Sequence, residues 1–283
     1  MLFENLKYII FDGAMGTMLQ GKGLKPGGRP DTMSITAPEV VESVHRMYVE
    51  AGSDIICANT FGANAYALRR TGYSPEEVIT AAINIAKKAS GGIAKIALDI
   101  GPTGQLLEPL GDLEFDKAYE IFKEQAIAGE KAGADIAAIE TMSDLNEVSA
   151  AIQAVTENTS LPVFVTMTFD KNGRTFMGCT PEDFAQTAEK LGATAVGLNC
   201  SLEPAEMYTT AERITKTTSL PLIVKPNAGL PDGATGIYSI GPQEFAMQMV
   251  QFAKLGVRIV GGCCGTTPEY IRVLRETFLG VGD

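Results

Sequence analysis

Eight short, mostly apolar segments recur along the chain of 283 residues, and stretches of helical length separate them. The segments span residues 8–12, 54–61, 95–100, 135–141, 162–169, 194–200, 221–226 and 257–262. Near-continuous apolar strands that alternate with helices are typical of a parallel sheet buried on both faces. Eight such units in a chain of this length predict an α/β protein with one domain, a (β/α)8 TIM barrel over residues 1–283.

The starts of several helices carry a capping signal, a polar residue three positions before an acid and often followed by proline. These residues are Thr36, Ser74, Asp144, Thr180 and Thr266. Two connections, residues 13–35 and 101–114, are longer than a barrel requires. Both follow a strand and therefore lie on the C-terminal face, where barrel active sites are built, so both are candidate lids.

The composition limits the partners and the compartment. A net charge of -11 without a basic block argues against nucleic acid and anionic membranes as partners. No apolar run approaches the roughly 20 residues that span a bilayer, and Glu4 stands where a secretory signal would be basic. We therefore expect a cytoplasmic protein. There, an odd count of five cysteines indicates free or metal-bound thiols and not disulfides.

Two adjacent cysteines, Cys263 and Cys264, stand between glycines at residues 261–262 and 265. Both can reach one metal only if the chain leaves strand geometry there, and glycine permits that departure and close approach of a ligand. A zinc site needs a third protein ligand, and Cys200 at the end of an apolar segment is the best candidate. The alternative is that these cysteines simply fill the core.

Polar residues gather at the C-terminal ends of the expected strands. They are Asp12, Asn59, Thr60, Asp99, Glu140, Thr141, Thr166, Thr168, Cys200, Asn227, Cys263 and Cys264. Cys57 lies inside a strand and Cys179 precedes a helix start, so we expect both to be packing residues. The single histidine, His45, lies within a helix, which leaves no histidine for general-base chemistry.

The expected metal site favours a particular chemistry. Three thiolates on a divalent cation leave a net charge of about -1, which makes the metal a poor activator of water. Such a site still stabilises an incoming thiol as its thiolate. An all-sulfur site with an open position therefore predicts activation of a thiol substrate, whereas a zinc hydroxide site normally uses histidines and a carboxylate.

Several motifs together resemble the homocysteine S-methyltransferase family, and the resemblance covers essentially the whole chain. The motifs are DGAMGT at residues 12–17, NTFG at 59–62, DIGPTG at 99–104, ET at 140–141, GLNC at 197–200, KPNAG at 225–229 and GGCCG at 261–265. The match is closest to the homocysteine-binding domain of cobalamin-dependent methionine synthases. The separated NC and GGCCG elements are the most specific part of it.

The resemblance implies a set of roles. Zinc is held by Cys200, Cys263 and Cys264, which are also the expected catalytic residues, and the sulfur of homocysteine completes the tetrahedron. Asp12 and Glu140 are expected to hold the substrate ammonium. The other expected substrate-binding residues are Gly13, Ala14, Met15, Gly16 and Thr17, whose backbone amides lie near the substrate carboxylate, together with Asn59, Asp99 and Asn227. Asn227 is also a candidate cap on zinc in the absence of substrate.

The sequence leaves the methyl donor open. The expected product is methionine, and the ETMSD stretch at residues 140–144 favours methylcobalamin on a partner protein or domain as the donor. S-methylmethionine or betaine is the alternative donor. A non-catalytic thiol- or metal-binding barrel is a further alternative, and so is a barrel that grips phosphate with residues 13–16 and 227–229.

Overall fold

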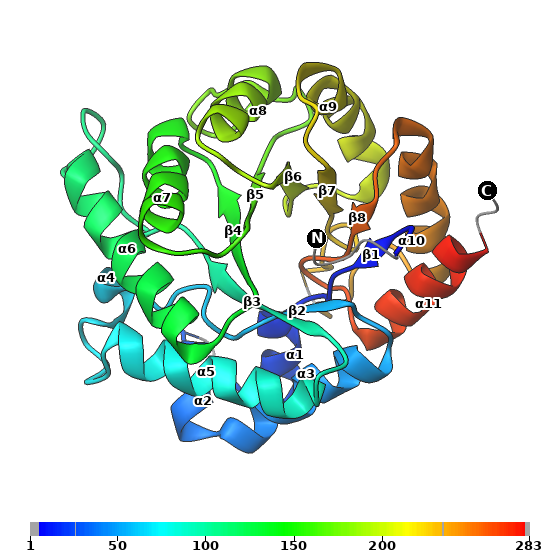
Figure 1. Ribbon diagram of the computed structural model, residues 1–283. Helices are drawn as coiled ribbons and strands as arrows, with labels where there is room; N and C mark the ends of the chain where they lie inside the picture. Colours follow the sequence, from blue (N-terminus) through cyan, green and yellow to red (C-terminus); the bar gives the residue numbers. More distant parts are fainter. Residues whose placement is uncertain (1–5, 26, 234, 281–283) are drawn as a thin grey trace.

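The computed structural model describes residues 6–25, 27–233 and 235–280 and shows eight parallel strands around one axis (Figure 1). The strands are β1 (Ile9–Ile10), β2 (Ile55–Cys57), β3 (Lys95–Ile100), β4 (Ile136–Met142), β5 (Val163–Met167), β6 (Ala195–Asn199), β7 (Leu222–Lys225) and β8 (Ile259–Val260). They pair in the order β1-β8-β7-β6-β5-β4-β3-β2. A parallel bridge between Phe11 and Ile55 joins the two edges. The predicted (β/α)8 barrel is confirmed.

Helices surround the barrel on the outside (Figure 1). They are α1 (Met15–Gly21), α2 (Met33–Thr36), α3 (Pro38–Glu50), α4 (Ala65–Leu68), α5 (Pro75–Ser90), α6 (Phe115–Ala132), α7 (Leu145–Asn158), α8 (Pro181–Lys190), α9 (Pro204–Thr217), α10 (Pro242–Met249), the 3-10 helix η1 (Val250–Leu255) and α11 (Pro268–Leu279). Two of the short helices, α1 and α2, lie within the first long connection. Among the described residues, no helix is both long and apolar enough to cross a membrane.

The barrel separates two apolar cores. The larger core lies between the strands and the helices, and the smaller one fills the barrel interior. The interior residues are Ile9, Phe11, Ile55, Cys57, Ala97, Ile136, Ala138, Phe164, Ala195, Ile223 and Ile259. Because side chains alternate along a strand, the next inward positions on β3, β4, β5 and β7 are Asp99, Glu140, Thr166 and Lys225. The interior therefore changes from apolar to polar at the C-terminal end.

The predicted helix starts are confirmed in part. Ser74 forms a full capping box with Glu77, and the side chains of Asp144 and Thr180 also cap their helices. The prediction is wrong for Thr36, which ends α2, and for Thr266, because Thr267 precedes α11. The Thr266 hydroxyl donates instead to the carbonyl of Cys263 at 2.7 Å. Tertiary structure near the site therefore overrides the local capping signal.

His45 lies in the middle of α3, as expected, and is fully buried. Neither of its ring nitrogens has a hydrogen-bond partner. Burial lowers the pKa of His45 to about 4, because the charged imidazolium would lose its hydration. His45 is therefore a neutral core residue near pH 7 and offers no general base to the site.

Candidate metal and substrate site

Three cysteine side chains meet at the C-terminal end of the barrel. The sulfur atoms of Cys200, Cys263 and Cys264 all lie within 4.8 Å of one another, and those of Cys200 and Cys264 are 3.9 Å apart. Sulfur atoms bound to one tetrahedral zinc at Zn–S distances of about 2.3 Å are roughly 3.8 Å apart. The spacing and the soft donor set therefore fit a zinc ion held by three thiolates.

Cys200 reaches this position because the chain turns sharply after β6. Cys200 and Ser201 have φ angles of 62° and 61°, in the left-handed region that L-residues rarely adopt. Each such residue costs on the order of 1 kcal/mol or more. The Cys200 N–H donates to the Lys225 carbonyl at 3.0 Å, and the Leu202 N–H donates to the Cys200 carbonyl at 2.7 Å. These bonds hold the strained turn in place.

The fully buried Asn199 connects this turn to two other strands. Its side-chain oxygen accepts from the Thr141 N–H and the Thr166 hydroxyl, each at 2.8 Å. Its nitrogen donates to the Thr141 hydroxyl at 2.8 Å and points to the Cys263 sulfur at 3.9 Å. Thr141 is also left-handed, with φ 63°. Asn199 was not among the residues predicted from the sequence, although it directly precedes Cys200.

The loop after β8 places the adjacent cysteines on one side of the chain. The Cys263 N–H donates to the Pro226 carbonyl at 2.8 Å, and the Cys264 N–H donates to the Asn227 side-chain oxygen at 3.1 Å. The Asn227 side-chain oxygen thus accepts a hydrogen bond from Cys264. Ligation of a metal by Asn227 stays a prediction. The loop after β7 therefore sets the position of both thiols.

The glycines beside the cysteines serve two different purposes. Gly265 has φ 80°, which favours glycine, as the sequence predicts for a departure from strand geometry. Gly262 instead provides space within the protein, because a Cβ atom there would lie 2.2 Å from the Thr266 hydroxyl oxygen. A side chain at Gly262 would therefore displace the threonine that closes the cysteine turn.

The three thiols share hydrogen bonds and influence one another's protons. Hydrogen bonds from the thiols of Cys263 and Cys264 lower the pKa of Cys200, because they stabilise its thiolate. Hydrogen bonds with Cys200 and Cys264, together with burial, raise the pKa of Cys263. The arrangement thus stabilises a first thiolate at Cys200. A divalent metal would supply the charge that deprotonates the other two.

A pocket of about 300 Å³ opens beside the thiols, a volume within the range of small-molecule sites. It is lined by Asp12, Gly13, Ala14, Met15, Gly16, Thr17, Pro30, Asp31, Cys57, Ala58, Asn59, Phe61, Asp99, Glu140, Thr141, Cys200, Lys225, Gly262, Cys263 and Cys264. Every predicted substrate residue except Asn227 is in this set. The connection of residues 13–35 contributes to the pocket wall, whereas residues 101–114 do not.

The acids of the pocket are buried or partly buried, and they surround a lysine that was not predicted from the sequence. Lys225 Nζ lies 2.5 Å from Glu140 Oε2. Asp12 accepts a hydrogen bond from the Cys57 N–H at 2.9 Å. Burial, opposed chiefly by the charge of Lys225, raises the pKa of Asp12 to about 7. Burial also raises the pKa of Asp99 well above its ordinary value, and the charge of Glu140 acts in the same direction.

The remaining predicted residues have distinct environments. The Asn59 side chain donates to the Pro30 carbonyl at 2.7 Å and so fastens the first long connection to the barrel. Cys57 is outside the thiol cluster, as expected, but it lines the pocket, with its sulfur 3.8 Å from Lys225 Nζ. The interpretation of Cys57 as mere packing is therefore incomplete. Cys179 is half-buried beside α8 and lines neither the cluster nor the pocket.

Three clustered thiols and an acidic pocket lie at the C-terminal face of a parallel barrel, where the active sites of barrel enzymes are built, and the thiols could hold a metal ion. A profile of the homocysteine S-methyltransferase family matches residues 9–278. The chain belongs to this family of methyl-transferring enzymes.

Two curated relatives are methionine synthases of mycobacteria. The protein of Mycobacterium leprae is 34% identical over 96% of this chain, and that of Mycobacterium tuberculosis is 32% identical over 94%. The chain spans 24% of the length of each. The metallated form of the homocysteine methyltransferase MmuM from Escherichia coli has a similar structure, with a TM-score of 0.84. It is 22% identical, and the match covers 97% of this chain and 98% of that one.

We predict that the protein binds about one zinc ion per chain and that serine in place of Cys200, Cys263 or Cys264 removes most of it. Serine keeps the size of the side chain but replaces a thiolate by a hydroxyl that stays protonated. Metal analysis of the purified variants measures the effect, and Cys179→Ser serves as the matched control with full zinc. Full zinc occupancy in Cys263→Ser would exclude this residue as a ligand.

Proposed function

We propose that the protein transfers a methyl group to the thiol of homocysteine to give methionine, with zinc as its metal and a methyl-corrinoid protein or domain as the donor. The observation that carries this proposal is that a cluster of thiols and a group of acids line the same pocket. Three thiols able to hold a metal line the same cavity as the buried acids Asp12 and Asp99 and the partly buried Glu140. A thiol and an ammonium group on one small substrate match these two features.

Different residues of the chain bind the different groups of the substrate. Asp12 and Glu140 bind and orient the substrate ammonium, since a charge-assisted hydrogen bond to a buried carboxylate is among the stronger ones. The backbone of residues 13–17 faces the carboxylate of the substrate. Cys200, Cys263 and Cys264 would hold the zinc, which would supply the positive charge that keeps the homocysteine sulfur a thiolate. The sulfur then forms a new bond to the methyl carbon, and the bond between that carbon and the donor breaks with its electron pair on the donor.

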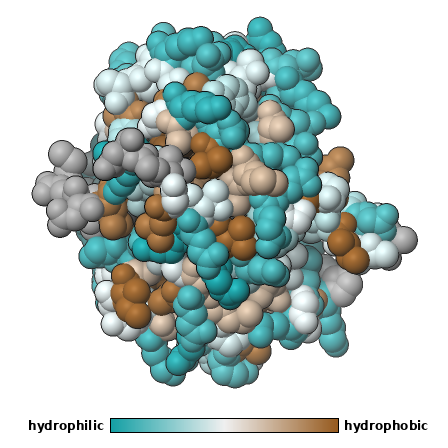
Figure 2. Space-filling view, turned by 90° about the vertical axis from the view of Figure 1, so that its right-hand side faces the viewer, coloured by the Kyte–Doolittle hydropathy of each residue, from teal (hydrophilic) through white to brown (hydrophobic). Residues whose placement is uncertain are grey.

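The rim of the barrel mouth supports a macromolecular donor. Leu106, Leu110, Phe176, Leu230 and Ile237 lie on loops that follow β3, β5 and β7, and each is more than half exposed. The loop after β7 projects from the molecule at the right of Figure 2 and carries apolar residues there. Exposed apolar side chains around a site mark surfaces that contact other macromolecules.

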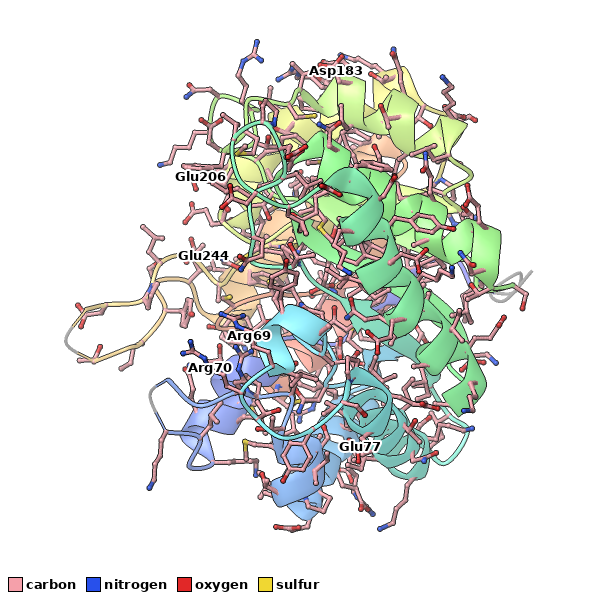
Figure 3. All side chains as sticks on the ribbon, turned by 90° about the vertical axis from the view of Figure 1, so that its left-hand side faces the viewer. Arg69, Arg70, Glu77, Asp183, Glu206 and Glu244 are labelled. Atoms are coloured by element: carbon pink, nitrogen blue, oxygen red, sulfur yellow. The ribbon has the colours of Figure 1, made fainter. Side chains whose placement is uncertain are left out.

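Cations lie at the same end of the molecule. The exposed residues Arg69 and Arg70, which follow α4, are on the side from which the loop after β7 projects (Figure 3). A protein that delivers a bound methyl group could contact both the cationic and the apolar parts of this rim. The names of the mycobacterial relatives, which are methionine synthases, support methionine as the product.

S-methylmethionine or betaine is the alternative donor. A non-catalytic thiol- or metal-binding role has no use for an acidic pocket. A phosphate site at residues 13–16 is disfavoured because buried acids line the same pocket. The cytoplasm, where thiols stay reduced, is the proposed compartment.

The donor is tested by methyl transfer with purified, zinc-loaded protein and homocysteine. Methylcobalamin, S-methylmethionine and betaine are offered in turn, and methionine is measured by mass spectrometry. We expect methionine with methylcobalamin alone, and none when Cys263→Ser replaces the parent. Methionine formed only with S-methylmethionine or betaine would refute the corrinoid donor but leave homocysteine methylation in place, whereas no product with any donor would contradict the proposed reaction.

We also predict that Asp12→Asn and Glu140→Gln each weaken homocysteine binding about ten- to a hundredfold while zinc content stays unchanged. Loss of a charge-assisted hydrogen bond to the ammonium costs about 1.5–3 kcal/mol. Isothermal titration calorimetry measures the affinity, and Glu276→Gln, an exposed acid on α11, is the control. If both pocket variants bind homocysteine like the parent protein, the ammonium site lies elsewhere.

A further inference from the structure

Lys225, the last residue of β7, is a buried cation whose side chain is only 4% exposed. Its Nζ atom lies 2.5 Å from Glu140 Oε2, 3.8 Å from the Cys57 sulfur and 4.5 Å from the centroid of the Phe11 ring. A buried ammonium loses its hydration, at a cost of several kcal/mol unless charges nearby replace it. Lys225 is thus a buried cation held by Glu140, Cys57 and Phe11, and it is not a solvated surface residue.

The described residues that line the pocket include four carboxyl groups, Asp12, Asp31, Asp99 and Glu140, and no cation other than Lys225. The Asp31 carboxylate accepts a hydrogen bond from the Gly62 N–H at 2.8 Å. Burial raises the pKa of Asp99 well above its ordinary value, and its Oδ1 atom has no hydrogen-bond partner. Among the described lining residues, Lys225 is therefore the one positive charge that faces these acids, and its ion pair is with Glu140.

Asp12 is the group whose charge this arrangement controls. The titratable groups that face it are Cys57 of β2, Asp99 of β3, Glu140 of β4, Lys225 of β7 and Tyr48 of α3. Lys225 is the only cation among them. Burial raises the pKa of Asp12 to about 7, and Lys225 is the strongest influence in the opposite direction. Loss of the lysine would therefore raise the pKa of Asp12 further.

We propose that Lys225 is a positioning residue for an amino-acid substrate: it fixes Glu140 through the ion pair and holds Asp12 as the carboxylate that receives the substrate ammonium. The inference rests on the proposed function, in which Asp12 and Glu140 bind that ammonium. With Glu140 paired to Lys225, the charge of Asp12 remains to balance the positive charge of the substrate ammonium. The pocket is thereby matched to a zwitterionic amino acid near neutral pH.

The test measures the pH dependence of norleucine binding to the zinc-loaded protein. Norleucine carries the ammonium and carboxylate of an amino acid but no thiol, so protons released by a sulfur–metal bond do not contribute. The parent protein is compared with Lys225→Met, which keeps an unbranched side chain without the charge, and with Lys225→Arg, which keeps the charge. Lys225→Gln is a second neutral variant, in case Lys225→Met does not fold.

In the parent protein, we expect binding to strengthen as the pH rises through about 7, because Asp12 ionises there. Loss of a nearby opposite charge raises the pKa of a carboxyl group, so this transition moves upward by about one pH unit in the neutral variants. Their affinity falls about tenfold or more at pH 6.5, and a smaller loss remains at pH 8.5, where Asp12 is ionised but Glu140 lacks its ion pair. Lys225→Arg keeps the transition of the parent protein.

Two results would contradict the inference in distinguishable ways. A neutral variant that binds norleucine with the pH profile of the parent protein would overturn the role of Lys225 and leave the proposed function intact. A parent protein that binds neither norleucine nor homocysteine at any pH would overturn the amino-acid pocket itself, and with it both proposals.

Discussion

The convergence of three thiols on one point is the constraint on which the rest of this site depends. Cys200 follows β6, whereas Cys263 and Cys264 follow β8, and β7 lies between these strands in the sheet. A parallel barrel brings the C-terminal ends of all its strands to one face, but strand geometry alone does not aim three sulfur atoms at one position. That requires the left-handed backbone at Cys200 and a sharp turn after β8.

The strain of this arrangement is offset by hydrogen bonds from neighbouring strands. Asn199 ties the turn at Cys200 to β4 and β5, and the loop after β7 holds both cysteines that follow β8. Residues in rarely populated backbone regions persist where their surroundings determine them. The thiol cluster thus depends on five strand ends together, and a change at β4 or β7 reaches the cluster without touching a cysteine.

Much of the site could be predicted from the sequence because it lies at strand ends. The apolar segments located Asp12, Asp99, Glu140 and the three cysteines, and the structure places all of them around one pocket. Lys225 was not predicted as a site residue, because it was considered only as the first residue of the KPNAG motif at residues 225–229. Its spacing of two residues from Ile223, an interior residue, was the available signal, since alternate side chains of a strand share a face.

Other features could not be obtained from local patterns. The environment of Asn199 depends on Thr141 and Thr166, which are distant in sequence and meet it only in the closed barrel. Thr266 has the local signal of a helix cap, but its hydroxyl closes the cysteine turn instead. Both outcomes are decided by tertiary contacts, where a long-range partner competes with a local one.

The central claim is that the three cysteines hold a metal with one position open for the thiol of homocysteine. X-ray absorption at the zinc edge, recorded with and without homocysteine, tests this claim most directly, because it counts the sulfur atoms bound to the metal. The account predicts about three sulfur ligands in the free protein and about four in the complex. A sulfur count that stays the same when homocysteine is bound would contradict it, because the substrate thiol would then remain off the metal.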